Sequence, residues 1–106
     1  MINLVKFDKV KVTILRRFEP SEVFKRSPAT PVASLTACDV FKDGQEFIVE
    51  DLEKPKGFCN TAWISIFADL RLLAFGGNLP YYKEKGTAIN ACVDGLRPVI
   101  FKLERI

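Results

Sequence analysis

Three cysteines are the residues of this sequence best suited to carry chemistry, and they lie far apart in the chain. Cys38 lies in TACDVF, Cys59 in GFCNTAW and Cys92 in NACVDG. The sequence contains no histidine, which removes the commonest general base and the commonest metal ligand. A Ser-His-Asp or Cys-His arrangement is therefore excluded within one chain. Any proton transfer must depend on carboxylates, lysine, tyrosine or a thiol.

Cys59 is the most informative of the three, because it directly precedes Asn60, the predicted N-cap of a helix. A helix N-terminus presents unpaired N–H groups and a partial positive charge, which together stabilise a thiolate. Lys54 and Lys56 act in the same direction. The alternative is that Phe58 and Cys59 are apolar residues that only anchor the chain against the helix. The residues themselves leave both interpretations open.

The environment of Cys92 depends on the register of the hairpin predicted around Asp94 and Gly95. A three-residue loop, 94–96, pairs the apolar residues of the two strands and places Cys92 on the opposite, more polar face. A loop of two or four residues places Cys92 on the apolar face instead. We predict the three-residue loop, because it matches apolar with apolar residues better. Cys38 lies in no periodic pattern, and taken alone it is predicted to be a buried thiol.

A metal or redox thiol site would combine Cys59 with Cys92 and Cys38. The spacings of 21 residues (38 to 59) and 33 residues (59 to 92) match no zinc-ribbon or ferredoxin pattern, since those patterns use close C-x-x-C pairs. In a reducing compartment, an odd number of cysteines does not indicate a disulfide framework. A thiolate-bound metal is the one cofactor that these residues suggest, and they do not specify which metal.

Three further residues are candidates for ligand binding. Arg97 can hold a carboxylate or a phosphate with two N–H groups, although a salt bridge beside the hairpin is the commoner role. Asn78 follows two glycines that either form an anion-binding nest or, as we prefer, only end a helix. Tyr81 is predicted to be exposed, where it can contact a ligand or another subunit.

Hydrophobic periodicity predicts the elements that position these residues. Strands are expected at residues 9–17, 47–50, 87–93 and 99–104. A short helix begins near Pro20, and residues 27–37 form a surface loop. A long helix runs from Asn60 to about Phe75 and ends at consecutive glycines. Its core-facing residues are Trp63, Ile66, Phe67, Leu70 and Leu73. These elements predict an α+β fold, in which one long helix packs on a small, mostly antiparallel sheet.

Length and composition indicate the class of protein. The 106 residues, 48% hydrophobic and 27% charged, predict one globular domain spanning 1–106. A net charge of +3 does not indicate a nucleic-acid partner. We expect no membrane span, and because MINLVKFDK lacks the apolar core of a signal peptide, we expect a cytoplasmic protein. A chain of this size has little room for both a core and a pocket, so we also expect a homo-oligomer.

Four blocks of the sequence carry a resemblance: CDVFKDGQEFIVE, KPKGFCNTAW, LLAFGGNLPYY and CVDGLRPVIFKLERI. They resemble a widespread, functionally uncharacterised family of small prokaryotic proteins of about a hundred residues. Its members look like C-x-x-F-x-x-G-x-E-F, G-F-C-x-x-A-W, F-G-G-N-x-P and D-G-x-R-P-V-x-F-K-x-E-R. The match covers residues 38–106 and includes all three cysteines. Typical members have a further cysteine where Ala91 stands and Pro-Trp where Asn60 and Thr61 stand, so a four-thiolate site is incomplete in this chain.

Three functions are consistent with the sequence. The favoured one is a thiolate-based metal-binding or redox site centred on Cys59. The alternative is an oligomeric binding or assembly module in which the cysteines are structural. An enzyme that acts through carboxylates and Arg97 ranks last, because no paired acidic motif accompanies the arginine.

Overall fold

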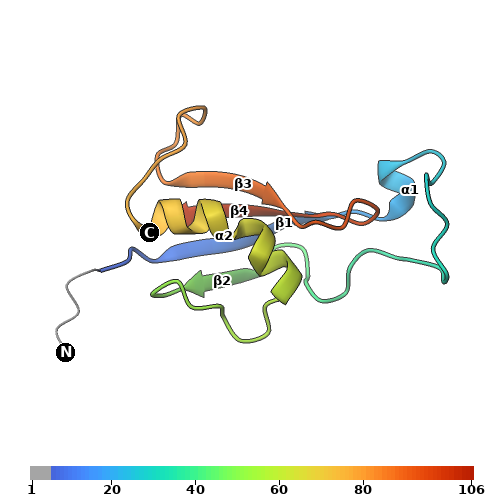
Figure 1. The fold of residues 1–106 in the computed structure, drawn as a ribbon, viewed down its shortest axis with the longest axis horizontal. Helices are drawn as coiled ribbons and strands as arrows, with labels where there is room; N and C mark the ends of the chain where they lie inside the picture. The colour runs from blue at the N-terminus through green and yellow to red at the C-terminus, as the bar shows by residue number, and fades with distance from the viewer. Residues whose placement is uncertain (1–5) are drawn as a thin grey trace.

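The structure, a computed structural model, describes residues 6–106 as one four-stranded antiparallel sheet with a helix across one face (Figure 1). The elements are β1 (Val10–Arg17), α1 (Pro20–Val23), β2 (Glu46–Val49), α2 (Asn60–Ala74), β3 (Thr87–Ala91) and β4 (Val99–Arg105). Their order in the sheet is β2-β1-β4-β3. The predicted α+β fold with one long helix is confirmed. The first five residues, MINLV, belong to the stretch predicted to lack a signal peptide and lie outside the described residues.

The two central strands, β1 and β4, explain why one face of the sheet is covered and the other is open. In both strands, alternate apolar side chains are fully buried on the face that α2 covers, as expected for a half-buried strand. These residues are Val10, Val12 and Ile14 in β1, and Val99, Phe101 and Leu103 in β4. On the open face, Lys11 Nζ lies 3.7 Å from Glu46 Oε2 and 3.9 Å from Glu104 Oε1. Charged pairs of this kind keep that face in contact with water.

Helix α2 follows the prediction to within one residue at its C-terminal end. Its buried residues are Ala62, Ile66, Leu70, Leu73 and Ala74. Trp63 and Phe67 are only partly buried and pack at the margin of the core. Trp63 and Phe67 were predicted to face the core with Ile66, Leu70 and Leu73; they do pack against it, but neither is fully buried. Ala62, Ile66 and Leu70, which are spaced four residues apart, form the face of the helix that is buried on the sheet. Trp63 and Phe67 each follow one of these residues, so they lie on the side of that face.

Two glycines end α2, as predicted. Gly76 adopts φ 89°, the left-handed conformation that favours glycine. Its N–H donates to the carbonyl of Leu73 at 2.9 Å, and the N–H of Gly77 donates to the carbonyl of Leu72 at 2.8 Å. This is the hydrogen-bond pattern of a Schellman motif. The guanidinium of Arg105 also donates to the carbonyls of Leu73 and Gly77, at 3.2 and 2.6 Å, where a cation interacts favourably with the helix dipole.

Residues 20–37, which we call the arm, project from the sheet and carry the predicted short helix and surface loop (Figure 1). The carboxylate of Glu22 accepts the backbone N–H of Glu19 at 2.9 Å and Arg16 Nη2 at 2.6 Å. Both bonds lower the pKa of the Glu22 carboxyl, and the bond from the Glu19 N–H has the larger effect. Every residue from Ser21 to Thr30 is exposed, so the arm contributes little to the core.

No helix among residues 6–106 combines the length and the apolar character needed to cross a membrane.

Candidate functional site

The three cysteines, far apart in the sequence, line one cavity of about 230 Å³. Cys59 lies at the start of α2, Cys92 follows β3, and Cys38 lies between the arm and β2. The other apolar lining residues are Val40, Phe41, Ala62 and Val99, and the polar ones are Thr61, Asp94 and Arg97. The cavity therefore lies where three segments of the chain meet at one end of α2.

The GFC stretch positions Cys59 through a different role for each residue. Gly57 adopts φ 84°, which turns the chain toward the helix. Phe58 is buried, and its ring centroid lies 5.0 Å from that of Phe41 and 5.9 Å from that of Phe101. These edge and tilted contacts anchor the segment to the core. Cys59 is partly exposed and faces the cavity. Phe58 thus supplies the anchoring contact and Cys59 lines the hollow.

Cys59 is itself the N-cap of α2, and the prediction that Asn60 occupies that position is wrong. The backbone of Cys59 is extended (φ −65°, ψ 129°), and its carbonyl accepts the N–H of Trp63 at 2.9 Å. Those two properties define the residue that begins a helix. Its side chain makes no capping hydrogen bond, so the sulfur is not committed to the helix backbone. The side chain of Asn60 instead accepts a hydrogen bond from Lys54 Nζ.

Cys92 lies on the helix-facing side of the sheet, and the predicted three-residue hairpin loop is wrong. Ala91 pairs with Ile100, and the N–H of Cys92 donates to the carbonyl of Val99 at 3.0 Å. Cys92 therefore lies opposite Val99, on the face that a two- or four-residue loop would have required. The actual loop is longer, residues 93–98, because the side chain of Asp94 closes a local turn within it. The N–H of Val99 also donates to Cys92 Sγ at 3.2 Å, which orients the sulfur.

Cys38 is held by an arginine rather than by burial. Its carbonyl accepts Arg17 Nη1 at 2.9 Å. Both Arg17 Nε and the Arg17 backbone N–H donate to Asp43 Oδ1 at 3.0 Å. The end of β1 thereby fixes the segment that carries Cys38. Cys38 is only partly buried, whereas a buried thiol was predicted, because cysteine as a residue type is usually buried.

Asp94 and Arg97 form the charged part of the cavity wall. Asp94 Oδ1 accepts the N–H groups of Leu96 and Arg97, at 3.1 and 3.3 Å, and Asp94 Oδ2 accepts Arg97 Nε at 3.2 Å. Arg97 was among the predicted ligand-binding residues, but Asp94 was interpreted only as a turn residue. The D-G-x-R spacing was the available signal, since Asp and Arg three residues apart can meet around a turn.

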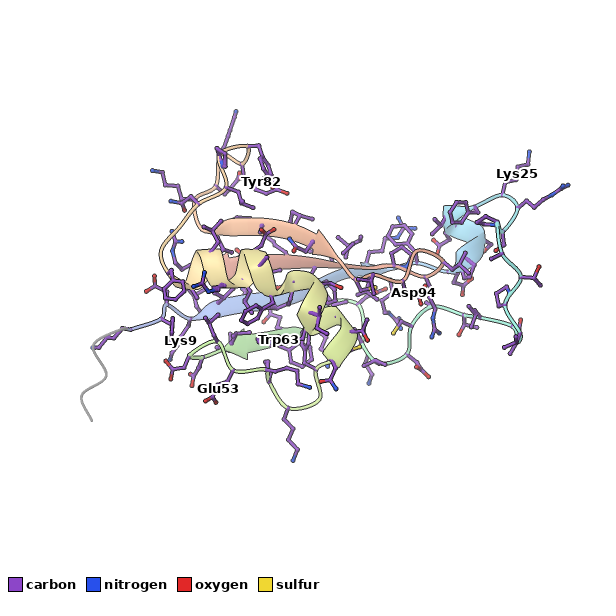
Figure 2. All side chains as sticks on the ribbon, viewed as in Figure 1. Lys9, Lys25, Glu53, Trp63, Tyr82 and Asp94 are labelled. Carbon is purple, nitrogen blue, oxygen red and sulfur yellow. The ribbon has the colours of Figure 1, made fainter. Side chains whose placement is uncertain are left out.

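The other two predicted ligand-binding residues lie away from the cavity. Asn78 Oδ1 accepts the N–H of Gly86 at 2.7 Å and Arg105 Nη2 at 3.0 Å, so this side chain holds the loop that follows α2. Tyr81 is 71% exposed, and its ring contacts that of Tyr82, with centroids 4.8 Å apart. Tyr82 and Asp94 lie beyond opposite ends of β3 (Figure 2). Arg97 alone of the three lines the cavity.

The chemistry available at the cavity is that of free thiols beside one carboxylate and one guanidinium. All three cysteines are unpaired thiols. Within residues 6–106, no three or more Cys, Asp or Glu side chains are arranged as a group that could hold a metal ion.

Comparison with protein-family models, curated proteins and solved structures returned no match. Membership of the small prokaryotic family remains a prediction from the four sequence blocks.

Proposed function

We propose that the cavity is a thiol-based redox site in which Cys59 is the attacking thiol. One observation carries the proposal: cysteines from three segments, separated by 21 and 33 residues, line the same hollow. Cys59 adds a second argument, since it occupies the N-cap of a fifteen-residue helix without using its sulfur as a cap. The N–H groups there stabilise negative charge on a nearby sulfur.

The proposed reaction is thiol–disulfide exchange. The Cys59 thiolate attacks one sulfur of a small disulfide, which forms a mixed disulfide and releases one thiolate. A second cavity thiol then attacks the Cys59 sulfur, which forms a disulfide within the protein and releases the other thiolate. Two protein thiols lose two electrons, and the small disulfide gains them; the two protons pass to the released thiolates. Cys92 is the favoured second thiol, because it lines the cavity and its sulfur is held by the Val99 N–H, and Cys38 is the alternative.

The first test is to treat the reduced protein with an excess of a small disulfide and to map the products by mass spectrometry under non-reducing conditions. We expect each chain to lose two thiols and to yield a peptide pair joined through Cys59. Cys92→Ser should stop the reaction at the mixed disulfide, whereas Cys38→Ser should leave it complete. Chains that keep all three thiols reduced, or that join only to other chains, would contradict the proposal.

A thiolate-bound metal is the second form of the same site, and the convergence of the three cysteines supports it. Protein purified without chelator would then contain metal, and Cys59→Ser would lower the metal content. Since the described residues hold no complete ligand group, binding would require a rearrangement of the cavity or a ligand from elsewhere. A metal content near zero in the parent protein would exclude the metal-binding form of the site and retain the redox form.

The second candidate function is an assembly module that acts as a homo-oligomer, and the exposed apolar side chains favour it. Val23, Phe24 and Val32 are exposed on the arm, and Tyr81 is exposed on the loop before β3. Exposed aromatic and apolar side chains are typical of subunit contacts. This candidate and the thiol site are compatible, because none of the four residues lines the cavity.

A further inference from the structure

We infer that the cavity selects small disulfides that carry a carboxylate, and that Arg97 binds that carboxylate. The inference depends on the proposed thiol site and names its class of substrate. It starts from Arg97, whose guanidinium is incompletely paired. The other groups that line the cavity are thiols, apolar side chains, the Thr61 hydroxyl and the Asp94 carboxylate, so Arg97 is its one cationic group among the residues that the structure describes.

Arg97 has hydrogen-bonding capacity left after its contacts within the protein are counted. Only Nε donates to a protein side chain, to Asp94 Oδ2 at 3.2 Å, and within residues 6–106 neither Nη group has a protein acceptor. A guanidinium held through Nε keeps four N–H groups, and these match the two oxygens of a carboxylate. The side chain is 32% exposed, so a ligand that enters the cavity can reach it.

Asp94 makes this arrangement firm and does not occupy the remaining N–H groups. One of its oxygens accepts two backbone N–H groups of the turn, and the other accepts Arg97 Nε. All three of these bonds lie within the turn, and the bond to Nε tethers the guanidinium to it. An arginine held in this way loses less side-chain freedom when it binds an anion.

The rest of the cavity defines the body of the ligand. Its volume of about 230 Å³ lies below the roughly 300–1,000 Å³ of pockets for drug-sized ligands, so the ligand must be small. The lining includes Val40, Phe41, Ala62 and Val99, which favour an apolar chain between the carboxylate and the reactive sulfur. A short aliphatic half-disulfide with a terminal carboxylate satisfies both requirements.

The reacting atoms follow from this placement. With the carboxylate held by Arg97, the Cys59 sulfur attacks the sulfur of the same half of the ligand. A bond forms between these two sulfurs, the original S–S bond breaks, and the other half leaves as a thiolate. A second protein thiol then releases the bound half as a thiolate, so the protein thiols are oxidised by two electrons and the disulfide is reduced by two.

The test compares three symmetrical disulfides of similar size and different charge: 3,3′-dithiodipropionate, 2-hydroxyethyl disulfide and cystamine. Rates of thiol loss are measured on the parent protein, Arg97→Gln, Arg97→Lys and Arg16→Gln, and each is divided by the rate of free 2-mercaptoethanol with the same disulfide. Arg16 is the matched control, because it pairs with Glu22 on the surface and does not line the cavity.

We expect the parent protein to prefer the dicarboxylate after this correction. Arg97→Gln should lower the dicarboxylate rate about tenfold, as expected for the loss of one charge-assisted hydrogen-bonded contact, and should leave the neutral rate unchanged. Arg97→Lys should recover part of the loss, and Arg16→Gln should behave as the parent.

The outcomes separate the two proposals. Thiols that react with none of the three disulfides would overturn the proposed redox function itself. Thiols that react with all three at equal corrected rates, or an Arg97→Gln protein that is slowed equally toward all three, would overturn the carboxylate inference alone. An equal slowing by Arg97→Gln would mean that the substitution had changed the turn rather than a ligand contact.

Discussion

At the scale of single residues, the three cysteines differ in the hydrogen bonds that they make with the rest of the protein. The Cys92 sulfur accepts the N–H of Val99, and the Cys38 carbonyl is held by Arg17. Cys59 is the N-cap of α2, and its side chain makes no capping bond. Of the three, only Cys59 therefore combines a position at a helix N-terminus with a side chain free of capping bonds.

The order of alkylation tests this difference. With a limiting amount of iodoacetamide at neutral pH, Cys59 should be modified before Cys38 and Cys92, because the helix N-terminus favours the nucleophilic form of its sulfur. Peptide mass spectrometry measures the order, and the experiment is repeated after chelator treatment, since a bound metal would protect the thiol. A Cys59 that stays unreactive under both conditions, in protein without metal, is a structural thiol.

At the scale of elements, α2 joins the core to the cavity. Its buried face packs on the sheet, while its first turn supplies Cys59, Thr61 and Ala62 to the cavity wall. The Schellman motif and Arg105 hold its other end. Phe58, which packs on Phe41 and Phe101, anchors the chain just before the helix, so both ends of α2 are held.

Substitutions along α2 test which face is buried. Leu70→Ala should lower the free energy of unfolding by about 2–5 kcal/mol, because Leu70 is fully buried. Ile64→Ala, on a side chain that is 75% exposed, should change it by less than about 0.5 kcal/mol. Trp63→Ala should fall between the two, since Trp63 is partly buried at the margin. Urea unfolding measures the free energy of all three variants. If Ile64→Ala destabilised the protein as much as Leu70→Ala, the face of α2 that packs on the sheet would not be the one described.

At the scale of the whole molecule, the arm makes the chain elongated. The described residues extend over 53 × 31 × 21 Å, with a radius of gyration of 15.5 Å, whereas a compact domain of this length has a radius of gyration of about 13 Å. Figure 1 shows α1 and the loop after it projecting beyond the sheet. The exposed Phe24 and Val32 of the arm gain little from burial within their own chain, so a second copy is the partner that we propose for them.

Light scattering tests this assembly. We expect the mass of a homo-oligomer at tens of micromolar protein, with cyclic symmetry as the default. Val32→Asp should shift the protein toward the monomer, because the side chain is fully exposed in the single chain and a buried carboxylate would weaken the contact. Ser34→Asp, on an exposed side chain in the same loop, is the control. A monomer mass for the parent protein would contradict the proposal.

The sequence by itself determined the elements, because their signals are local. The alternation of Val10, Val12 and Ile14 specified β1 and its buried face, and the consecutive glycines specified the end of α2. Only the tertiary structure decided that Cys38, Cys59 and Cys92 line one cavity, since no local pattern encodes a meeting of three segments so far apart. It also decided the hairpin register: the Asp94 side chain lengthened the loop, which moved Cys92 to the helix-facing side. A one-residue change in register moves every side chain of a strand to the other face, and that step lies beyond what periodicity can resolve.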